Sequence, residues 1–527
     1  MRAVSKAFSL ILLCGVALLN AAAQCPKRPD TGTIVHDALS LTSNNGTLSA
    51  EFTMRHSVDD AGYTHYCYNY KTAKGEVESP TLRLNPGDKL DLDILNRIHE
   101  DDGAEMTGMD GMTMPGKVCG DGGTLTITST NVHFHGMNVP PKCHQDDVLT
   151  TIIQPDKPAF PFRITMPNDQ PPGLYWYHPH PHGFTEFQVN GGAAGALVIG
   201  GMEKYRPEVA GLLERVFVIR QQFLVPWIPG PYELTFNYQV AFHPPFPAPI
   251  VKMKEGDKEF WRVSNSTNQD FMPLQVVYNG KPQPLQLIAL DGYPLAKART
   301  QTTILLPPAG RAEFIVKAPP KGAVAQFQTN AYDTGITGNP DLAEVLADIE
   351  LSKDRDPNAI IMPSKDAGTG DRDRLRFGGI AQQKPTTQRK LYFSEKFGGT
   401  GGPIEFYITV DGQKPKVFEA DEKPVITTHV GAVEDWTIEN RALETHDFHI
   451  HQIHFLMLEV DGKPAKHQDM RDSMEIPFWE GPGHPYHKIK VRMDFRDPTI
   501  AGTFVFHCHI LLHEDLGMMH KILVLPK

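Results

Sequence analysis

The sequence lacks three features, and each absence excludes a class of protein. Beyond the N-terminal segment, no apolar stretch is long enough to span a bilayer, so we expect no membrane span. No excess of basic residues is present, since the net charge is −11 at pH 7, and this argues against a nucleic-acid partner. Long segments free of Gly and Pro are scarce, with 45 Gly and 44 Pro among 527 residues, which favours short strands joined by turns.

The first 23 residues have the pattern of a secretory signal. Arg2 and Lys6 precede an apolar run from Ala7 to Leu19, and three alanines follow. We therefore expect cleavage after Ala23 and an exported chain, either periplasmic or secreted. The other 504 of the 527 residues correspond to about three domains at roughly 150 residues each.

Cysteine is also scarce, with six residues in the chain. Cys14 lies in the signal segment, and Cys508 stands alone near the C-terminus, where it is either a small buried apolar residue or a metal ligand. The other four lie in the first third of the sequence: Cys25, Cys67, Cys119 and Cys143. In an oxidising compartment these four can form up to two disulfides, in any of three pairings that the sequence cannot distinguish.

One pattern occurs three times along the chain. A glycine is followed by Leu or Trp, an apolar residue and an asparagine at alternate positions, in Gly87 to Asn96, Gly256 to Asn265 and Gly431 to Asn440. Alternation with period two is typical of a strand with one buried face. Copies spaced by 169 and 175 residues indicate three tandem β-sandwich domains. The predicted boundaries are 24–205 for the first domain, 206–353 for the second, 354–390 for a linker and 391–527 for the third.

Histidine, by contrast, is abundant, and its 23 residues are clustered. Four His-x-His pairs occur: His133/His135, His178/His180, His449/His451 and His507/His509. On a strand, residues two apart project from the same face, roughly 6 to 7 Å from each other, so each pair can direct two imidazoles to one place. Imidazole is the commonest neutral ligand for copper, zinc and iron, so the pairs predict a metal site.

The last pair indicates which metal is bound. Because its two histidines face one side of a strand, Cys508 between them faces the other side. A thiolate combined with the imidazoles of His446 and His513, and with Met518 as a weak axial ligand, is the donor set of a blue-copper electron-transfer site. The C-terminal motif therefore predicts copper.

These motifs resemble those of the three-domain multicopper oxidases of the laccase and cuprous-oxidase family. HFHG, HPHPHG, HDFHIH and HCHILLHEDLGMM match the four copper motifs of that family, in order. The resemblance implies an all-β chain of three tandem cupredoxin-like Greek-key sandwiches. It also implies four copper ions, of which one is type 1, one is type 2 and two are type 3.

The resemblance also implies a ligand set for each ion. The type 1 ion takes His446, Cys508, His513 and Met518, and the type 2 ion takes His133 and His449. The type 3 pair takes His135, His178 and His509 on one ion, and His180, His451 and His507 on the other. In the repeat register, Leu274 and Val276 stand where the third domain has histidines, so we expect the trinuclear cluster between the first and third domains.

Two carboxylates are expected to take part in catalysis. Reduction of dioxygen to two waters consumes four protons, so acids bonded to water at the cluster are chemically required. By resemblance, Glu514 delivers protons and Asp146 lies near the path of dioxygen, with Asp147 as a competitor for the second role. Glu444, close to His446, is interpreted as a surface carboxylate that could also bond a phenolic donor.

The sequence leaves the electron donor open. Met106, Met109, Met112 and Met114 lie in a Gly- and Asp-rich insertion, and thioethers bind Cu(I), but the same pattern fits an exposed loop. We favour a laccase-like enzyme, expected to be a monomer, that oxidises phenols or aromatic amines with dioxygen. A cuprous oxidase for copper detoxification is the alternative, and the complete ligand set argues against a non-enzymatic cupredoxin.

Overall fold

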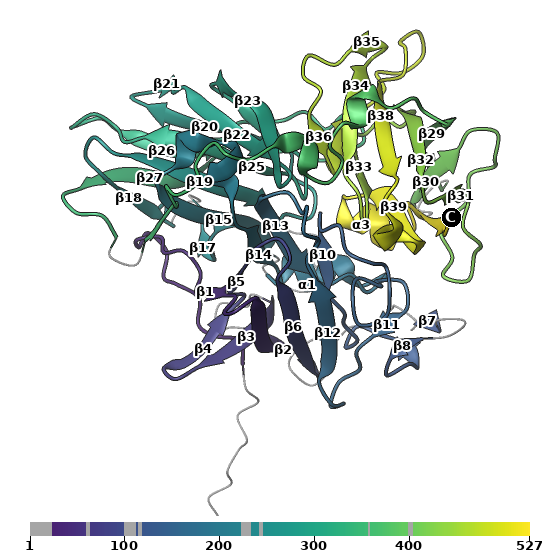
Figure 1. Ribbon diagram of the computed structural model, residues 1–527, viewed down its shortest axis with the longest axis horizontal. Coiled ribbons are helices and arrows are strands. Elements are labelled where there is room, and N and C mark those ends of the chain that lie inside the picture. The colour runs from purple at the N-terminus through teal and green to yellow at the C-terminus, as the bar shows by residue number, and fades with distance from the viewer. Residues whose placement is uncertain are drawn as a thin grey trace, which may run out of the picture.

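The computed structural model describes residues 24–58, 64–99, 112–113, 118–222, 233–241, 246–356, 359–398 and 404–527. The predicted signal segment and Met106, Met109 and Met114 of the insertion lie outside these residues, and of Met112 only the backbone is described. Within them, strands dominate and form three two-sheet units in chain order (Figure 1). The expectation of an all-β chain of three tandem sandwiches is confirmed.

The first unit has two five-stranded sheets around one apolar core. One sheet has the order β1 (Ser40–Thr42), β5 (Thr81–Leu84), β14 (Gly195–Ile199), β13 (Gly173–His178) and β10 (His133–His135). The other has the order β12 (Phe160–Thr165), β6 (Lys89–Arg97), β2 (Thr47–Val58), β3 (Thr64–Thr72) and β4 (Gly75–Glu78). Short elements complete the unit: β7 (Met112–Thr113), β8 (Cys119–Gly120), β9 (Thr124–Leu125), β11 (Thr151–Ile152), α1 (Thr185–Asn190), α2 (Met202–Tyr205) and η2 (Pro207–Val209).

The second unit is built in the same way. One sheet has the order β17 (Gln239–Val240), β16 (Glu233–Phe236), β15 (Leu213–Gln222), β19 (Lys258–Asn265), β25 (Arg311–Lys317), β22 (Leu285–Leu290) and β23 (Tyr293–Gln301), with β28 (Ile360–Ile361) beside β15. The other has the order β18 (Ile250–Lys254), β27 (Glu344–Ser352), β26 (Ala325–Thr329), β20 (Met272–Tyr278) and β21 (Lys281–Pro282), with β24 (Ile304–Leu306) beside β20.

The third unit completes the chain. One sheet has the order β30 (Ile404–Val410), β29 (Thr387–Phe397), β32 (Ala432–Asn440), β38 (Lys488–Phe495), β34 (Phe455–Val460) and β35 (Lys463–Pro464), with β36 (Met470–Arg471) beside β34. The other has the order β31 (Ile426–His429), β40 (Met519–Leu525), β39 (Gly502–Cys508), β33 (His446–Ile450) and β37 (Ser473–Ile476). Its helical turns are η5 (Pro498–Ile500) and α3 (Leu511–Asp515).

The predicted linker, 354–390, contains some sheet structure. β28 pairs with β15 of the second unit, and β29 of the third unit begins at Thr387. Between them lie two short helical turns, η3 (Arg372–Arg374) and η4 (Ile380–Gln382).

Each copy of the sequence repeat forms the same strand of its unit. These strands are β6, β19 and β32, and each pairs in parallel with an earlier strand and antiparallel with a later one. The glycine that precedes each strand has a φ of +82° to +100° (Gly87, Gly256 and Gly431), a region that side chains disfavour. The spacing of the repeat therefore reflects one turn and one strand used three times.

The asparagine that ends each copy closes a turn. In Asn96, Asn265 and Asn440, the side-chain oxygen accepts a hydrogen bond from the backbone N–H two residues later, at 2.9 to 3.2 Å. The amide nitrogen of each donates to two or three backbone carbonyls. Asparagine recurs here because its amide satisfies both kinds of backbone group in one tight turn.

Two disulfides settle the pairing that the sequence left open. Cys25 pairs with Cys67 on β3, and Cys119 on β8 pairs with Cys143. The second disulfide joins the end of the insertion to the loop that leads to Asp146. Among the described cysteines, Cys508 is free, and it is buried.

The third unit packs against the first, with α3 close to α1 in Figure 1. Asp515 at the end of α3 accepts hydrogen bonds from the backbone N–H groups of Gly183, Thr185 and Glu186, at 2.8 to 3.1 Å.

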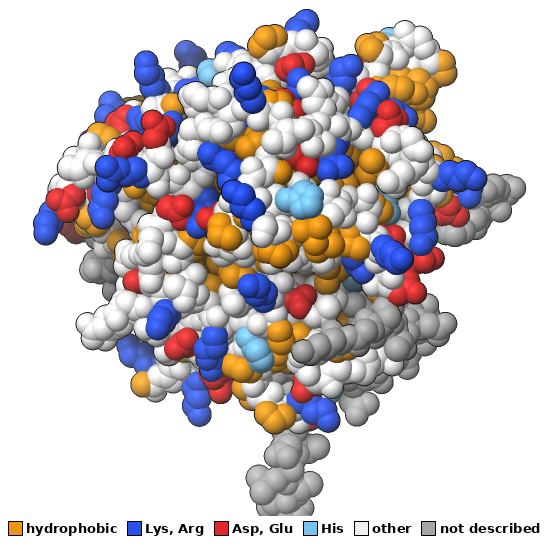
Figure 2. Space-filling view, turned by 45° about the vertical axis from the view of Figure 1, so that its right-hand side comes forward, with side chains coloured by type: hydrophobic (Ala, Val, Ile, Leu, Met, Phe, Trp, Pro, Cys, Tyr) orange, Lys and Arg blue, Asp and Glu red, His pale blue; other side chains and the backbone are white. Residues whose placement is uncertain are grey.

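On the face shown in Figure 2, basic and acidic side chains are interspersed with small apolar patches. None of the helices in the described part of the chain has both the length and the apolar character needed to cross a bilayer.

Replacement of Asn265 with Ala should destabilise the protein, because it removes the donor to three backbone carbonyls in the second unit. Each buried hydrogen bond contributes about 1 kcal/mol, so we expect the free energy of unfolding to fall by about 2–3 kcal/mol, measured by chemical denaturation. Asn440→Ala serves as the matched variant in the third unit. Unfolding curves that coincide with wild type for both variants would contradict this role.

Candidate metal centre

The eight histidines of the four pairs lie together between the first and third units. They come from β10 and β13 in the first unit, from β33 and β39 in the third, and from residues directly after these strands. Cross-strand register places His133 opposite His178 and His449 opposite His507. All eight side chains are buried. Alternation along four strands therefore directs the pairs to one place, as the sequence predicts.

Ring nitrogens of these histidines form three groups, in each of which they lie within 4.8 Å of one another. The groups are His135 with His178 and His509, His180 with His451 and His507, and His133 with His135 and His449. The first two have the membership expected of the two type 3 sites. The third contains the pair expected of the type 2 site.

Hydrogen bonds fix several of these rings from behind. Nδ1 of His178, His449 and His507 each donates to a backbone carbonyl 2.7 or 2.8 Å away. Nε2 of His507 lies 3.2 Å from Nε2 of His451, so these two nitrogens are directed at the same space. A bond on one ring nitrogen fixes the tautomer and leaves the lone pair of the other directed at the centre.

The chemistry of the centre fits metal ions. Seven of the eight histidines have a buried ring nitrogen without a hydrogen-bond partner among the described residues: His133, His135, His178, His180, His449, His451 and His509. An unsatisfied buried polar atom costs about 1–3 kcal/mol. Coordination of metal ions would satisfy all of these nitrogens at once.

Burial also keeps the imidazoles in the form that binds metal. Desolvation lowers the pKa of seven of the eight, and neighbouring imidazoles lower most of them further: His135, His178, His180, His449, His451, His507 and His509. For His507 the pKa is about 3. These rings are therefore neutral at pH 7, with lone pairs free to coordinate.

Cys508 lies on the face of β39 opposite to the one that carries His507, in the core of the third unit. Its Sγ is 3.6 Å from Nδ1 of His446 and 3.8 Å from Nδ1 of His513. The rings of Phe393 and Phe406 pack against the two imidazoles. The structure therefore brings together the predicted Cys and His donors in a buried, apolar setting.

Met518 is fully buried in the same core cluster. Its backbone N–H donates to the carbonyl of His513 at 2.8 Å, and its carbonyl accepts from the N–H of Cys508 at 3.1 Å. Burial raises the pKa of the Cys508 thiol well above its usual value, although backbone N–H groups bonded to the sulfur oppose this. A cation at this site would favour the thiolate.

Asp146 lies behind His133. Its carboxylate is 3.0 and 3.1 Å from Nδ1 of His133, and it accepts from the N–H of Phe134 at 3.0 Å and from Nε2 of Gln452 at 2.5 Å. Asp147 instead accepts hydrogen bonds from Thr150 in the following turn. Of the two candidates, Asp146 is the one that contacts the cluster, and it does so by orienting a histidine.

Glu514 faces the other side of the cluster. Its Oε1 is 3.4 Å from Nδ1 of His180, and its Oε2 is 3.7 Å from Nδ1 of His507. The hydroxyl of Thr185 donates to Oε1 at 3.1 Å. Burial, together with the nearby Asp515, raises the pKa of Glu514 well above its usual value. The side chain can therefore carry a proton at neutral pH.

Two carboxylates at the Cys508 site were overlooked or undervalued by sequence reasoning. Glu395 Oε1 lies 3.2 Å from Nε2 of His446, and Glu444 Oε2 lies 3.5 Å from Nε2 of His513. Burial raises the pKa of Glu444 to about 8, and the adjacent Glu395 adds to the shift. Glu444 is thus a half-buried neighbour of the site. Glu395 gave no sequence signal beyond its place on a half-buried strand.

Without metal, the protein should lose stability as the pH falls from about 7 to about 5. The unfolded chain binds protons at histidines near pH 6.5, whereas the buried rings have lower pKa values, so acid favours the unfolded state. Each buried histidine costs about 1.4 kcal/mol at one pH unit below 6.5. Denaturant unfolding at several pH values should show this slope, and bound metal should not flatten it, because coordinated imidazoles also carry no proton. A pH-independent free energy of unfolding would contradict the prediction.

Comparison with known proteins identifies the family. Models of multicopper oxidase domains match residues 124–204 and 399–527. The chain is 26% identical over 459 residues to a multicopper oxidase of Staphylococcus aureus, covering 85% of this chain and 83% of that protein. It is 22% identical over 427 residues to a laccase of Bacillus subtilis, covering 75% and 79%.

Solved structures agree with this result. A Campylobacter jejuni multicopper oxidase, described as a metallo-oxidase, superposes with a TM-score of 0.66 at 22% identity, covering 96% of this chain and 99% of that one. The match confirms the expected cupredoxin-like fold. The family models and the curated relatives show that the chain contains multicopper oxidase domains, and multicopper oxidases are oxidoreductases that use copper, dioxygen and a reducing substrate.

Proposed function

We propose that this protein takes single electrons from phenols or aromatic amines at the Cys508 site and uses four of them to reduce dioxygen to two waters at the histidine cluster. The covalent connection between the two sites carries this proposal. Cys508 belongs to one site, while its neighbours His507 and His509 belong to two groups of the other. An electron therefore has to cross only one or two residues.

Four copper ions fit the donor groups. His446, Cys508, His513 and Met518 would hold the type 1 ion, and His133 and His449 the type 2 ion. His135, His178 and His509 would hold one type 3 ion, and His180, His451 and His507 the other. Bound copper would supply one-electron redox chemistry at the first site and dioxygen reduction at the cluster.

Glu514 and Asp146 are the carboxyl groups that act at the cluster. Glu514 contacts two cluster histidines and has a raised pKa, so it can hold a proton at neutral pH and deliver it to the cluster. Asp146 keeps the ring of His133 in place through its Nδ1. A carboxylate in that position sets the tautomer and raises the basicity of the other ring nitrogen.

Features at the Cys508 site favour an aromatic donor. Glu444, whose side chain is 16% exposed, sits at the outer nitrogen of His513 and can accept a hydrogen bond from a phenolic O–H or an anilinic N–H. Leu512 and Leu516, in the same helical turn as His513, are exposed and offer apolar surface. Together they provide a polar acceptor and a surface for a flat ring.

A second candidate is oxidation of Cu(I). The Met-rich insertion supports it through the softness of thioether ligands. Action outside the cytoplasm is proposed for either function, supported by the signal-like N-terminus and by two disulfides, which persist in oxidising compartments.

Replacement of Glu514 with Gln should leave the blue absorption and the copper content unchanged but slow turnover by about a hundredfold, because the amide cannot deliver a proton. Dioxygen uptake measures this. Glu259→Gln is the matched control, since Glu259 is a buried acid of the second unit, with its pKa raised to about 7 by burial, and bonds Trp261. Turnover of Glu514→Gln at the wild-type rate would refute the proton role.

Dioxygen uptake with two donors decides between the candidate functions. We expect rapid uptake with an electron-rich phenol, a fall of about tenfold in kcat/KM for Glu444→Ala, which removes the acceptor, and no effect when the four insertion methionines are replaced by Ser. Faster uptake with Cu(I), lost on those Met replacements, would favour the second candidate. Absence of uptake with either donor would contradict both.

A further inference from the structure

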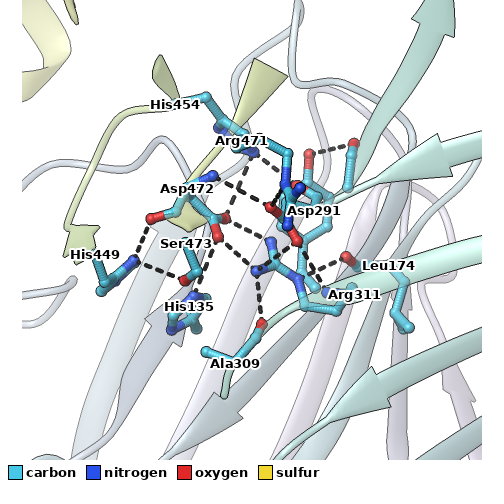
Figure 3. Close-up of polar contacts among 12 residues, drawn as sticks. His135, Leu174, Asp291, Ala309, Arg311, His449, His454, Arg471, Asp472 and Ser473 are labelled. Carbon is cyan, nitrogen blue, oxygen red and sulfur yellow. Dashed lines mark hydrogen bonds and ion pairs between the residues drawn. The ribbon is translucent and has the colours of Figure 1, made fainter. Parts of the chain in front are cut away.

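A buried ion-pair network joins the second unit to the third (Figure 3). Arg311, the first residue of β25, binds Asp472 of the third unit through both terminal nitrogens, at 2.6 and 2.5 Å. Asp291 of the second unit accepts from the backbone N–H of Arg311 at 2.9 Å and from Nε of Arg471 at 2.5 Å. Arg311, Asp291 and Asp472 are completely buried.

Asp472 contacts one cluster histidine from each of the units that supply them. Its Oδ1 is 3.4 Å from Nε2 of His135 in the first unit, and its backbone carbonyl accepts from Nδ1 of His449 in the third at 2.7 Å. The opposite nitrogens, Nδ1 of His135 and Nε2 of His449, have no partner among the described residues. These two histidines share a group with His133. Asp472 thus holds the outer edges of two of the three rings in that group.

Arg311 in turn contacts all three units. Its Nε donates to the carbonyl of Leu174 at 3.3 Å, on the strand of the first unit that carries His178. Its Nη1 also donates to the carbonyl of Ala309 at 3.0 Å in its own unit. All three nitrogens of the planar guanidinium therefore donate hydrogen bonds to fixed acceptors, a pattern that a lysine ammonium could not reproduce.

The ion pair packs directly against the HFHG motif. A Cβ on Gly136, which follows His135 and has a φ of +80°, would lie 2.5 Å from both Arg311 Nη2 and Asp472 Oδ2. The glycine is therefore needed because side chains from the other two units occupy that space. Both the backbone next to His135, at Gly136, and the His135 side chain therefore lie against Arg311 and Asp472.

Asp291 and Arg311 favour their charged forms although they are buried. Burial alone would raise the pKa of Asp291, but Arg471 and Arg311 outweigh it and lower that pKa below its usual value. Burial likewise opposes the charge on Arg311, yet Asp472 and Asp291 raise its pKa. Apolar residues can replace buried ion pairs with little loss of stability, so a bidentate pair at this place points to a role in geometry.

We infer that Arg311 and Asp472 are positioning residues for His135 and His449, so that the second unit, which supplies no histidine to the cluster, sets the geometry where the type 2 site of His449 adjoins the type 3 site of His135. This inference rests on the copper binding proposed above. It gives the second unit a role in positioning the cluster histidines of the other two units.

Copper-loaded Arg311→Lys protein tests the inference. We expect an altered electron paramagnetic resonance spectrum of type 2 copper and about tenfold weaker retention of that ion against a chelator, with the blue type 1 absorption unchanged. The matched control is Arg262→Lys. Arg262 is equally buried, lies on the adjacent strand β19, and binds Glu214 and Glu313 rather than an acid at the cluster.

Two further variants separate positioning from folding. Asp472→Asn keeps the backbone carbonyl and the shape of the side chain, and should change the same spectrum. Arg311→Met combined with Asp472→Asn leaves no unpaired buried charge, so thermal stability should recover while the altered spectrum persists. Wild-type spectra in these variants, or an equal change in Arg262→Lys, would overturn the inference. Wild-type protein without any type 2 signal would instead contradict the proposed copper binding.

Discussion

Burial of eight imidazoles at one point is the constraint on which the rest of the structure depends. Each ring needs one nitrogen directed at the centre, and the other must be satisfied without water. The structure meets this need with backbone carbonyls behind His178, His449 and His507 and with carboxyl groups behind His133 and His180. Four of these partners belong to the same unit as the ring they contact, whereas Glu514 of the third unit contacts His180 of the first. Docking of the two units therefore brings together rings that are largely oriented within their own units.

The repeated strand frame shows how one scaffold serves different tasks. In each unit the same strand begins at a left-handed glycine and ends at an asparagine that closes a turn. In the third unit the strand that follows this turn carries His446 and His449, whereas in the second unit it carries Leu274 and Val276. The second unit keeps the frame and contributes Arg311 and Asp291 at its border with the third.

Local sequence patterns were enough to predict tandem β-sandwich units and histidine pairs on one strand face, whereas the membership of each histidine group came from the resemblance to the multicopper oxidases. The alternation that made each repeat a strand also put both histidines of a pair on one face, as in His133 and His135 on β10. Asp472 and Glu395 were missed because their importance comes from contacts distant in sequence, such as the 337 residues between His135 and Asp472. The disulfide pairing was undecidable for the same reason, since it depends on which loops meet. Glu444 was undervalued because a charged residue before a motif gives no sign of its burial.

The position of the cluster between the first and third units has a consequence for the order of events during synthesis. The four cluster histidines of the first unit leave the ribosome more than 200 residues before the four cluster histidines of the third. Neither half can hold the ions by itself, since each of the three groups contains histidines from both units. Metal uptake at the cluster therefore has to wait until the chain is complete. A truncated product that lacks the C-terminal strands would not form the cluster.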